Sequence, residues 1–347
     1  MNKGWQRSFG IASCYIGAVI GAGFASGQEI LQFFIQFGRP GLWGIIFAAI
    51  LFSILGSFIL AYNFKCKINS YDQFLNHSLG LFWGKFADVL LSFVLFAGLV
   101  VMLACSTAAL KQQFAMPLLP SLLITYMVIL VTVAAGEKGV IVFNSIVIPV
   151  LILITVLVSL GSIQSSNSAQ QFIAHKLTLA GGNWLLASIL YVSYNIILGA
   201  VMLTSLSISS QKDIWGGFLG GIGLGIIAFL IGLALFHNFN EVENIEIPML
   251  YLAQKTSPIL NYFYAAVLWL EIITTAVANI FALVQRMIQK FRGSTLGWTL
   301  FFLLAASILT PYGFVHLITA IYPVLGYLGL FISSAVVFAL LKKKVRI

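Results

Sequence analysis

Charged residues are scarce in this chain. Only 8% of its 347 residues are Asp, Glu, Lys or Arg, while 61% are hydrophobic, and the mean hydropathy is +1.04. Soluble domains carry about 25% charged residues, so the composition excludes a soluble protein and indicates an integral membrane protein. No polar stretch is long enough to form a separate catalytic domain. We therefore expect one membrane domain filling 1–347, and no enzyme.

Cysteine and acidic residues are also rare. The three cysteines are widely spaced and form no CxxC motif or Cys/His cluster, so neither a disulfide framework nor a thiolate metal site is expected. The sequence indicates no cofactor beyond a coupling ion. Nine acidic residues face 18 basic ones. Basic loops against anionic lipid explain the net charge of +9 without nucleic acid as a partner.

Long apolar runs account for most of the chain. A helix needs about 20 mainly apolar residues to cross the hydrocarbon core of a membrane. That length predicts ten spans, over 8–37, 41–64, 87–111, 118–135, 140–163, 183–209, 214–236, 258–288, 295–311 and 313–341. The last two share one uncharged stretch, divided at Thr310–Gly313 because proline and glycine interrupt helices.

The basic residues indicate the orientation. With the N-terminus in the cytoplasm, 14 of the 18 lysines and arginines fall on the cytoplasmic side, and Arg39, Lys111, Lys176 and Lys255 fall outside. The bias predicts a multi-pass membrane protein with both termini in the cytoplasm. The outer loop 237–257 mixes apolar and acidic residues, and is either a short helix covering the outer mouth or a plain solvated loop.

Ten spans divide into five plus five around the loop 164–182. An odd number per half makes the two halves enter the membrane from opposite sides, so the sequence predicts an all-α fold built as an inverted repeat over about 8–163 and 183–341. Transporters of this plan bind substrate near the midplane, on discontinuous helices in corresponding positions of the two halves. Spans one and six are therefore expected to be discontinuous.

The first span contains an unusual stretch for a membrane helix. Residues 17–29 read GAVIGAGFASGQE, with four glycines followed by Ser26, Gln28 and Glu29. Unwound backbone persists in a membrane only where it faces a cavity or a ligand. The glycines could let the chain approach a solute closely, or they could serve as small-residue packing faces. The polar residues that follow favour a binding site lined by Gly21, Ala22, Gly23, Phe24 and Ser26.

Span six is the counterpart of span one. Ser193, Tyr194, Asn195 and Gly199 interrupt its apolar run near the middle, which predicts a weaker break. Tyr191, Tyr194 and Asn195 are candidates to line an apolar pocket for the substrate.

Two acids lie well inside the expected spans. Charged residues in membrane spans are costly and usually functional, so Glu29, with its neighbour Gln28, and Glu271 are candidate coupling or gating residues. Glu271 shares a helix face with Thr274, Thr275 and Ala278. The alternative for each acid is a structural carboxylate that accepts hydrogen bonds from neighbouring helices. Glu29 is expected about 9 Å beyond Gly23 along the outer half-helix.

The stretch IGAGFASGQEI and the ten-span plan resemble the YkvI-like group of bacterial amino-acid permeases, within the amino acid-polyamine-organocation superfamily and the LeuT fold. The resemblance implies a location in the bacterial cytoplasmic membrane, and that backbone N–H groups at Gly21–Gly23 hold a substrate carboxylate. It also implies a sodium site between span one and a hydroxyl pair on span eight, with ligands from Gly17, Ile20, Thr274 and Thr275.

These observations together predict a symporter for a small amino acid or a related organic solute. Sodium is the expected coupling ion, because the hydroxyl pair is present and span five lacks the lysine that replaces sodium in some relatives. The alternatives are a proton carried by Glu29 or Glu271, a permease for cations or amines, and a membrane sensor that has lost transport. The sequence does not specify the oligomeric state.

Overall fold

The structure, a computed structural model, describes residues 3–68, 70–79, 81–135, 137–164, 182–206, 208, 210–291 and 293–342. All regular structure in these ranges is helical. Nine of the helices described are long and apolar enough to cross a membrane. They are built on α4 (Arg39–Cys66), α6 (Leu81–Phe114), α7 (Leu118–Ala135), α8 (Glu137–Gln164), α9 (Trp184–Ser205), α10 (Trp215–His237), α13 (Pro258–Phe291), α14 (Thr295–Ser307) and α15 (Phe314–Lys342).

The first span makes the tenth crossing in pieces. It comprises α1 (Lys3–Val19), α2 (Ala22–Ala25), α3 (Gln28–Phe33) and the 3-10 turn η1 (Ile35–Phe37). The remaining short elements are α5 (Tyr71–Leu79), η2 (Gln211–Ile214), α11 (Phe239–Val242), α12 (Pro248–Thr256) and η3 (Thr310–Tyr312). Spans nine and ten separate at η3 as expected, because Gly313 follows with φ +83°. The loop expected over 164–182 lies almost wholly outside the described residues.

The contacts between helices follow a two-fold pattern. A contact made by a span of the first half recurs between the equivalent spans, five positions along the sequence. Span one contacts span seven through α1 and α10, and span six contacts span two through α9 and α4. Likewise α6 contacts α15, and α13 contacts α8. The short helix α5 packs on α6 and α15, as α12 packs on α13 and α8. This pairing is the one that an inverted repeat of five spans produces.

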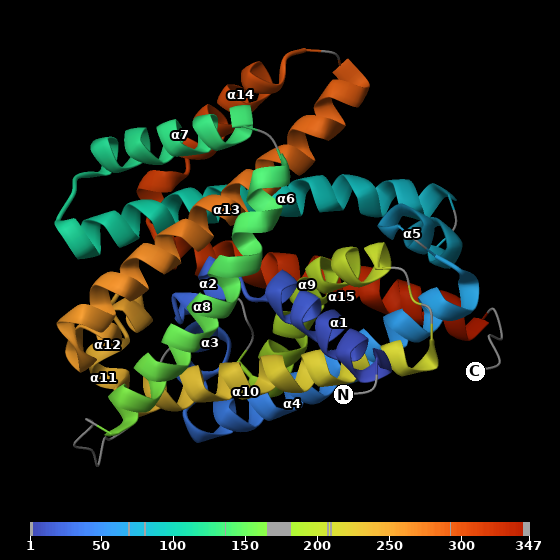
Figure 1. Ribbon diagram of the computed structural model, residues 1–347, viewed down its shortest axis with the longest axis horizontal. Coiled ribbons are helices and arrows are strands. Elements are labelled where there is room, and N and C mark those ends of the chain that lie inside the picture. The colour runs from blue at the N-terminus through green and yellow to red at the C-terminus, as the bar shows by residue number, and fades with distance from the viewer. Residues whose placement is uncertain are drawn as a thin grey trace.

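The helices form two groups. In Figure 1, α1, α4 and α10 lie in the lower part of the molecule, and α6, α7 and α14 in the upper part. The short pieces α2 and α3 of the first span lie between these groups, because α2 contacts α6, α8 and α13 while α3 contacts α9, α10 and α15. The interrupted segment is thus at the centre of the fold.

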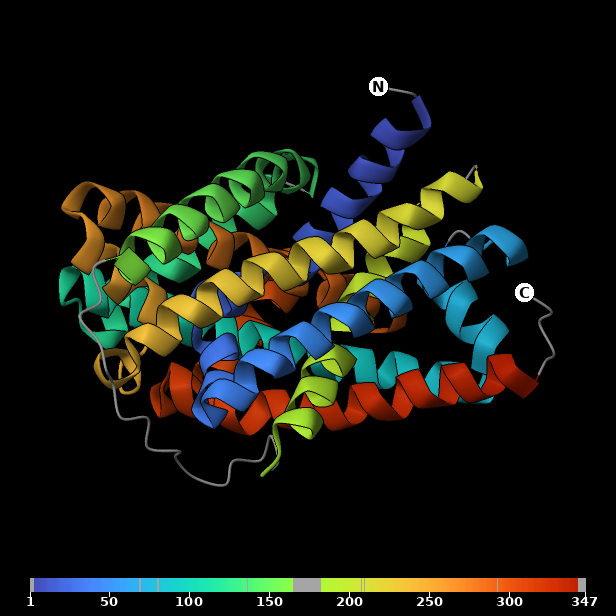
Figure 2. The same ribbon diagram turned by 90° about the horizontal axis from the view of Figure 1, so that it is seen from below.

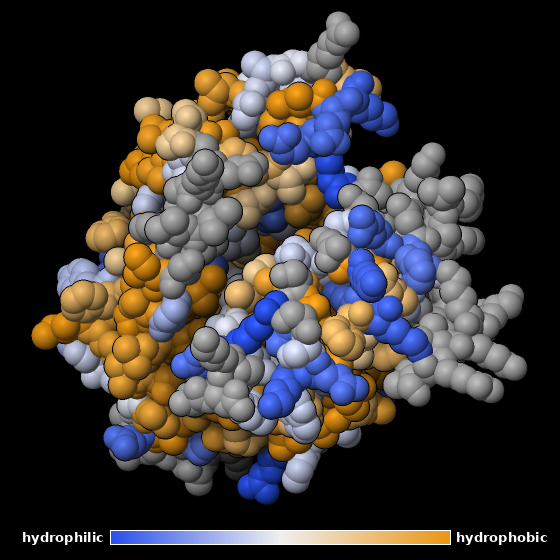
Figure 3. Space-filling view, turned by 45° about the vertical axis from the view of Figure 1, so that its right-hand side comes forward, coloured by the Kyte–Doolittle hydropathy of each residue, from blue (hydrophilic) through white to orange (hydrophobic). Residues whose placement is uncertain are grey.

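The two ends of the molecule differ. Figures 1 and 2 place α5, the start of α1 and the end of α15 at one end, and α11 and α12 at the other. Figure 3 brings the first of these ends forward and shows hydrophilic residues gathered there, beside a broad hydrophobic surface. The end that carries the start of α1 is therefore polar, and the hydrophobic surface beside it suits contact with lipid.

Tyr15 holds four spans of the lower group together. Its side chain is fully buried, and its hydroxyl donates to the Phe52 carbonyl of α4 at 3.1 Å. The ring lies against three glycines, one each on α4, α9 and α10, where an added Cβ would approach ring carbons to 2.7, 2.6 and 2.6 Å: Gly56, Gly199 and Gly220. Larger residues at these positions would exclude the ring.

A second row of glycines joins α10 to α4. A Cβ on Gly217 would lie 2.5 Å from the Gly56 carbonyl carbon, and one on Gly221 would overlap the backbone of Ser53. Positions 217, 221 and 225 are spaced by four and share one helix face, the small-xxx-small pattern that allows close backbone contact in membranes. Backbone-to-backbone packing therefore fixes the separation of α4 and α10.

This packing predicts the effect of a single methyl group. Gly217→Ala should lower the free energy of unfolding by about 1–3 kcal/mol, because the Cβ meets backbone atoms that cannot rotate away. Gly10→Ala is the matched control, since nothing lies within 4 Å of its Cβ position. Thermal melting in detergent should give a lower apparent melting temperature for Gly217→Ala alone. Equal melting temperatures would contradict the proposed packing.

Candidate functional site

The first span is broken at its middle. Helix α1 ends at Val19, and Gly21 is extended with φ −112° and ψ −175° before α2 begins at Ala22. The N–H groups of Ala22, Gly23 and Phe24 form the first turn of α2, so no carbonyl of that helix accepts hydrogen bonds from them. The discontinuity expected in span one is confirmed, and it exposes backbone donors at the centre of the protein.

A second turn follows within six residues. Gly27 has φ +84°, a left-handed conformation that favours glycine, and it separates α2 from α3. The Ser26 hydroxyl donates to the Gly23 carbonyl at 2.7 Å and accepts from the Gln28 N–H at 3.2 Å. Ser26 therefore stabilises the turn and is not directed at a free space.

This turn brings Glu29 back onto Gly23. A Cβ added to Gly23 would overlap Oε1 of the Glu29 carboxylate, so the missing side chain makes room for that carboxylate. The expected separation of about 9 Å along one helix is therefore wrong. The physical reason is the left-handed turn at Gly27, which ends the regular rise on which that distance depends.

Aromatic side chains surround the carboxylate. The Tyr194 hydroxyl of α9 donates to Glu29 Oε2, and the Tyr322 hydroxyl of α15 lies 3.1 Å from the Cβ position of Gly23. The Tyr194 ring centroid is 5.1 Å from that of Tyr322 and 5.9 Å from that of Phe33. Tyr191, also on α9, packs against Phe33 at 5.5 Å. Four rings from three elements thus form a continuous wall beside Glu29.

Sequence reasoning missed Tyr322 and Phe33. Phe33 lies four residues after Glu29, so it shares a face of α3 with it. That spacing was available in the sequence. Tyr322 precedes Pro323 in the last span, and only the tertiary contact between α15 and α3 brings it to the site.

Span six is continuous, contrary to expectation. Helix α9 runs unbroken from Trp184 to Ser205. Its polar side chains bond within the helix, since Ser193 Oγ donates to the Ile189 carbonyl at 2.6 Å and Asn195 Nδ2 to the Tyr191 carbonyl at 3.1 Å. These bonds need no unwinding. Gly199, expected as part of the break, instead accommodates the Tyr15 ring, and Asn195 is buried against its own helix.

Glu271 and the hydroxyl pair lie together on α13, which contacts α2. The Thr275 hydroxyl donates to Glu271 Oε1 at 3.3 Å, and the Thr274 hydroxyl to the Glu271 carbonyl at 3.1 Å. Glu271 Oε2 is buried and is one of the described side-chain atoms without a hydrogen-bond partner. The Glu271 carboxylate and the two threonine hydroxyl oxygens keep lone pairs for a ligand.

The other expected sodium ligands lie on the first span. Gly17 is near the end of α1, where a Cβ would lie 3.2 Å from Ile148 of α8, and Ile20 is the residue at the break. No hydrogen bond in the described ranges joins either residue to Thr274 or Thr275. Helix α13 contacts α2, which begins two residues after Ile20, whereas Gly17 lies on α1.

The face of α13 that carries Glu271 opens to the surface. Glu271 is 3% exposed, Thr275 is half-buried and Ala278 is exposed. Residues seven apart share a helix face and are about 10 Å apart along the axis. A buried carboxylate is therefore connected to the surface along one stripe of α13, running toward the end of the molecule where α1 starts.

Within the described part of the chain, neither Glu29 nor Glu271 has a basic partner. The ion pairs found among the described residues are Arg7–Asp213, Lys111–Glu246 and Lys255–Glu241, all away from the break. Glu29 is 5% exposed. A buried carboxylate without a counter-charge is unfavourable. Each of the two must therefore take up a cation, either a proton or a bound ligand.

The loop 237–257 forms a lid at the opposite end. The Met249 N–H of α12 donates to the Ser26 carbonyl at 3.0 Å, and Gln28 Nε2 donates to the Ile245 carbonyl at 2.8 Å. The Tyr264 hydroxyl of α13 donates to the Ala25 carbonyl. Of the two alternatives for this loop, the contacts favour the helical cover. Gln28 is thus bonded to the lid and not to the site.

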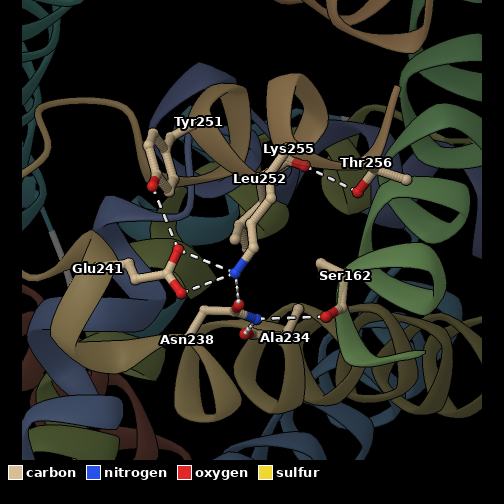
Figure 4. Close-up of polar contacts among 8 residues, drawn as sticks. All are labelled: Ser162, Ala234, Asn238, Glu241, Tyr251, Leu252, Lys255 and Thr256. Carbon is tan, nitrogen blue, oxygen red and sulfur yellow. Dashed lines mark hydrogen bonds and ion pairs between the residues drawn. The ribbon is translucent and has the colours of Figure 1, made fainter. Parts of the chain in front are cut away.

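Within the lid, Lys255 joins α12 to α11 and to Asn238, the residue that follows the end of α10 (Figure 4). Its Nζ lies 2.7 and 2.9 Å from the Glu241 carboxylate oxygens and donates to Asn238 Oδ1 at 3.1 Å. Asn238 Nδ2 in turn donates to the Ala234 and Ser162 carbonyls. Partial burial and a hydrogen bond to Glu241 raise the pKa of the Tyr251 hydroxyl above its usual value.

Three solved structures share this fold. Mhp1 in an inward-facing conformation has a TM-score of 0.66 at 14% identity, over 93% of this chain and 73% of its own. A Na⁺-coupled sialic acid symporter has a TM-score of 0.58 at 14% identity, over 97% and 85%. A variant of the Eremococcus coleocola manganese transporter has a TM-score of 0.55 at 15% identity, over 98% and 78%. The chain is therefore a membrane protein with the LeuT-type fold of secondary transporters.

Two curated proteins are similar over nearly their full lengths, whereas no protein-family model matches the chain. The uncharacterized membrane protein YkvI of Bacillus subtilis strain 168 is 30% identical over 345 residues, which cover 96% of this chain and 95% of YkvI. The uncharacterized protein YyaD of the same organism is 29% identical over 342 residues, which cover 94% and 95%. The chain belongs to the YkvI family of membrane proteins.

The Lys255 contacts predict how readily the lid opens. Lys255→Met should speed hydrogen exchange of the Met249 amide by about two- to fivefold, because a partly exposed ion pair contributes about 0.2–1 kcal/mol. Lys212→Met, at the opposite end of the molecule, is the control. An unchanged exchange rate in Lys255→Met would mean that this ion pair does not hold the lid.

Proposed function

We propose that this protein is a secondary active transporter that moves a small amino acid or a related organic solute by alternating access. The observation that carries the proposal is the broken first span, which places Glu29 and free backbone donors between two groups of helices. The lid closes one end of the molecule, while the Glu271 face of α13 reaches the surface toward the other. This asymmetry suits a transporter that opens to one side at a time.

Sodium is the coupling ion that we propose. Hard cations bind oxygen ligands, and the Glu271 carboxylate with the Thr274 and Thr275 hydroxyls supplies them on one helix that contacts the break. The carbonyls of Gly17 and Ile20 would complete the site, as the family resemblance implies. The unpartnered Glu271 Oε2 supports a ligand at this position.

Proton coupling is the second candidate. Glu29 supports it, because a buried carboxylate with no basic partner among the described residues can be neutralised by a proton. A sensor that keeps the fold without transport is the alternative from another class. Solute counterflow in proteoliposomes separates transport from sensing, because a sensor binds solute without moving it.

The coupling proposal predicts a sodium effect that depends on two hydroxyls. Sodium should increase the affinity for the transported solute, and Thr274→Ala combined with Thr275→Val should remove this increase while the protein stays folded. Thr132→Val is the control, since that hydroxyl bonds its own helix in α7. Binding titrations with and without sodium measure the effect. Uptake that ignores sodium, follows a pH gradient and is lost in Glu29→Gln would favour the proton instead.

The packing of Glu29 predicts a separate effect at Gly23. Gly23→Ala should weaken solute binding strongly, because its Cβ displaces the Glu29 carboxylate and lies close to the Tyr322 hydroxyl. The loss of stability should be small, because both groups are the ends of side chains and not backbone. Binding and thermal melting of the same samples distinguish the two effects, with Gly10→Ala as the control for both. Unchanged binding in Gly23→Ala would mean that this glycine serves helix packing and not solute binding.

A further inference from the structure

The position over Gly23 is occupied by the protein's own carboxylate. The family resemblance implies a substrate carboxylate at the backbone N–H groups of Gly21–Gly23. In the structure, Glu29 Oε1 takes the space where a side chain on Gly23 would lie, and Oε2 accepts from Tyr194. While Glu29 is ionised, a second carboxylate at this position would be repelled, since like charges at contact distance are strongly unfavourable in a buried site.

The surroundings of Glu29 suit an organic cation better than a metal ion. Tyr194 donates to Glu29, the Tyr322 hydroxyl lies beside the same position over Gly23, and the rings of Phe33 and Tyr191 pack against Tyr194. Rings attract ammonium groups through their negative faces, and a carboxylate beside them adds a full counter-charge. In the described part of the chain, no group of three His, Cys, Asp or Glu side chains is placed to hold a metal ion.

A second observation points to a polar ligand at this position. The Tyr191 hydroxyl is one of the buried side-chain atoms that have no hydrogen-bond partner in the described ranges, and the residue is 1% exposed. Its ring packs against that of Tyr194 with the centroids 5.7 Å apart, and Tyr194 donates to Glu29. A buried hydroxyl left unpaired is costly, whereas an ammonium group with several N–H donors would satisfy both this oxygen and Glu29.

We infer that the transported solute is a small organic amine without a carboxylate, held through its ammonium group by Glu29 and through its apolar part by the four rings. The inference rests on the proposed transport function and narrows its substrate class. It also assigns the two buried acids different cations. Glu29 takes the ammonium group of the substrate, and Glu271, with hydroxyl neighbours, takes the coupling ion.

Matched ligand pairs test the inference on the purified full-length protein. Phenethylamine and phenylalanine share one side chain, as do isoamylamine and leucine, and each pair differs by the carboxylate. Isothermal titration and thermal shift should detect binding of the amines, with the amino acids at least tenfold weaker. Glu29→Gln should weaken amine binding by roughly tenfold or more, because a charged hydrogen bond is lost. Glu243→Gln on the lid loop should leave amine binding unchanged.

Three results would overturn the inference. They are tighter binding of the amino acids than of the matching amines, no binding of either amine, and amine binding that is unaffected by Glu29→Gln in protein that melts like the wild type. The first two results are measured on the wild-type protein, so they remain decisive even if the Glu29→Gln variant fails to fold. Amines that bind but show no counterflow in proteoliposomes would instead refute transport and leave the binding class intact.

Discussion

The contact between the Glu29 carboxylate and Gly23 is the interaction on which the centre of this protein depends. It requires a residue without a side chain at position 23 and a left-handed turn at Gly27 to bring the carboxylate back. It also requires Tyr194 from span six to donate to that carboxylate. Because no basic side chain among the described residues pairs with Glu29, the arrangement leaves a buried acid that needs a cation in the middle of the membrane domain.

The surrounding helices hold this contact in place without charge. Glycines allow α4 and α10 to touch through their backbones, and three more allow Tyr15 to join α1 to α4, α9 and α10. In a membrane, where apolar burial provides little driving force between helices, such close packing is the main source of stability. The rigid group formed in this way carries Tyr191 and Tyr194, while the lid and α13 hold the segment after the break from the other side.

Much of the fold could be predicted from the sequence, because span length and the position of basic residues depend on the membrane and not on tertiary contacts. The break in span one was also predictable, since four closely spaced glycines followed by three polar residues disfavour a continuous membrane helix. The break expected in span six was wrong, because Ser193 and Asn195 bond to their own helix, a choice that the residue types alone do not specify.

The sequence predicted the residues of the site better than it predicted how they are arranged in space. Glu29, Tyr191 and Tyr194 could be selected as polar or aromatic residues near the expected midplane. Their convergence could not, because it depends on one backbone turn at Gly27 and on the contacts of α3 with α9 and α15. Tyr322 carries no signal of its own in the sequence. The glycines of α10, by contrast, do carry a signal in the sequence, because their spacing of four indicates close helix packing in the membrane.

A cryo-EM map of the protein in lipid nanodiscs tests the central claim most directly. The account predicts a first helix that stops at Val19, an extended Gly21, and density for the Glu29 side chain over Gly23 and against the Tyr194 hydroxyl. A first helix that continues unbroken through residues 17–29, with Glu29 directed away from Gly23, would contradict it.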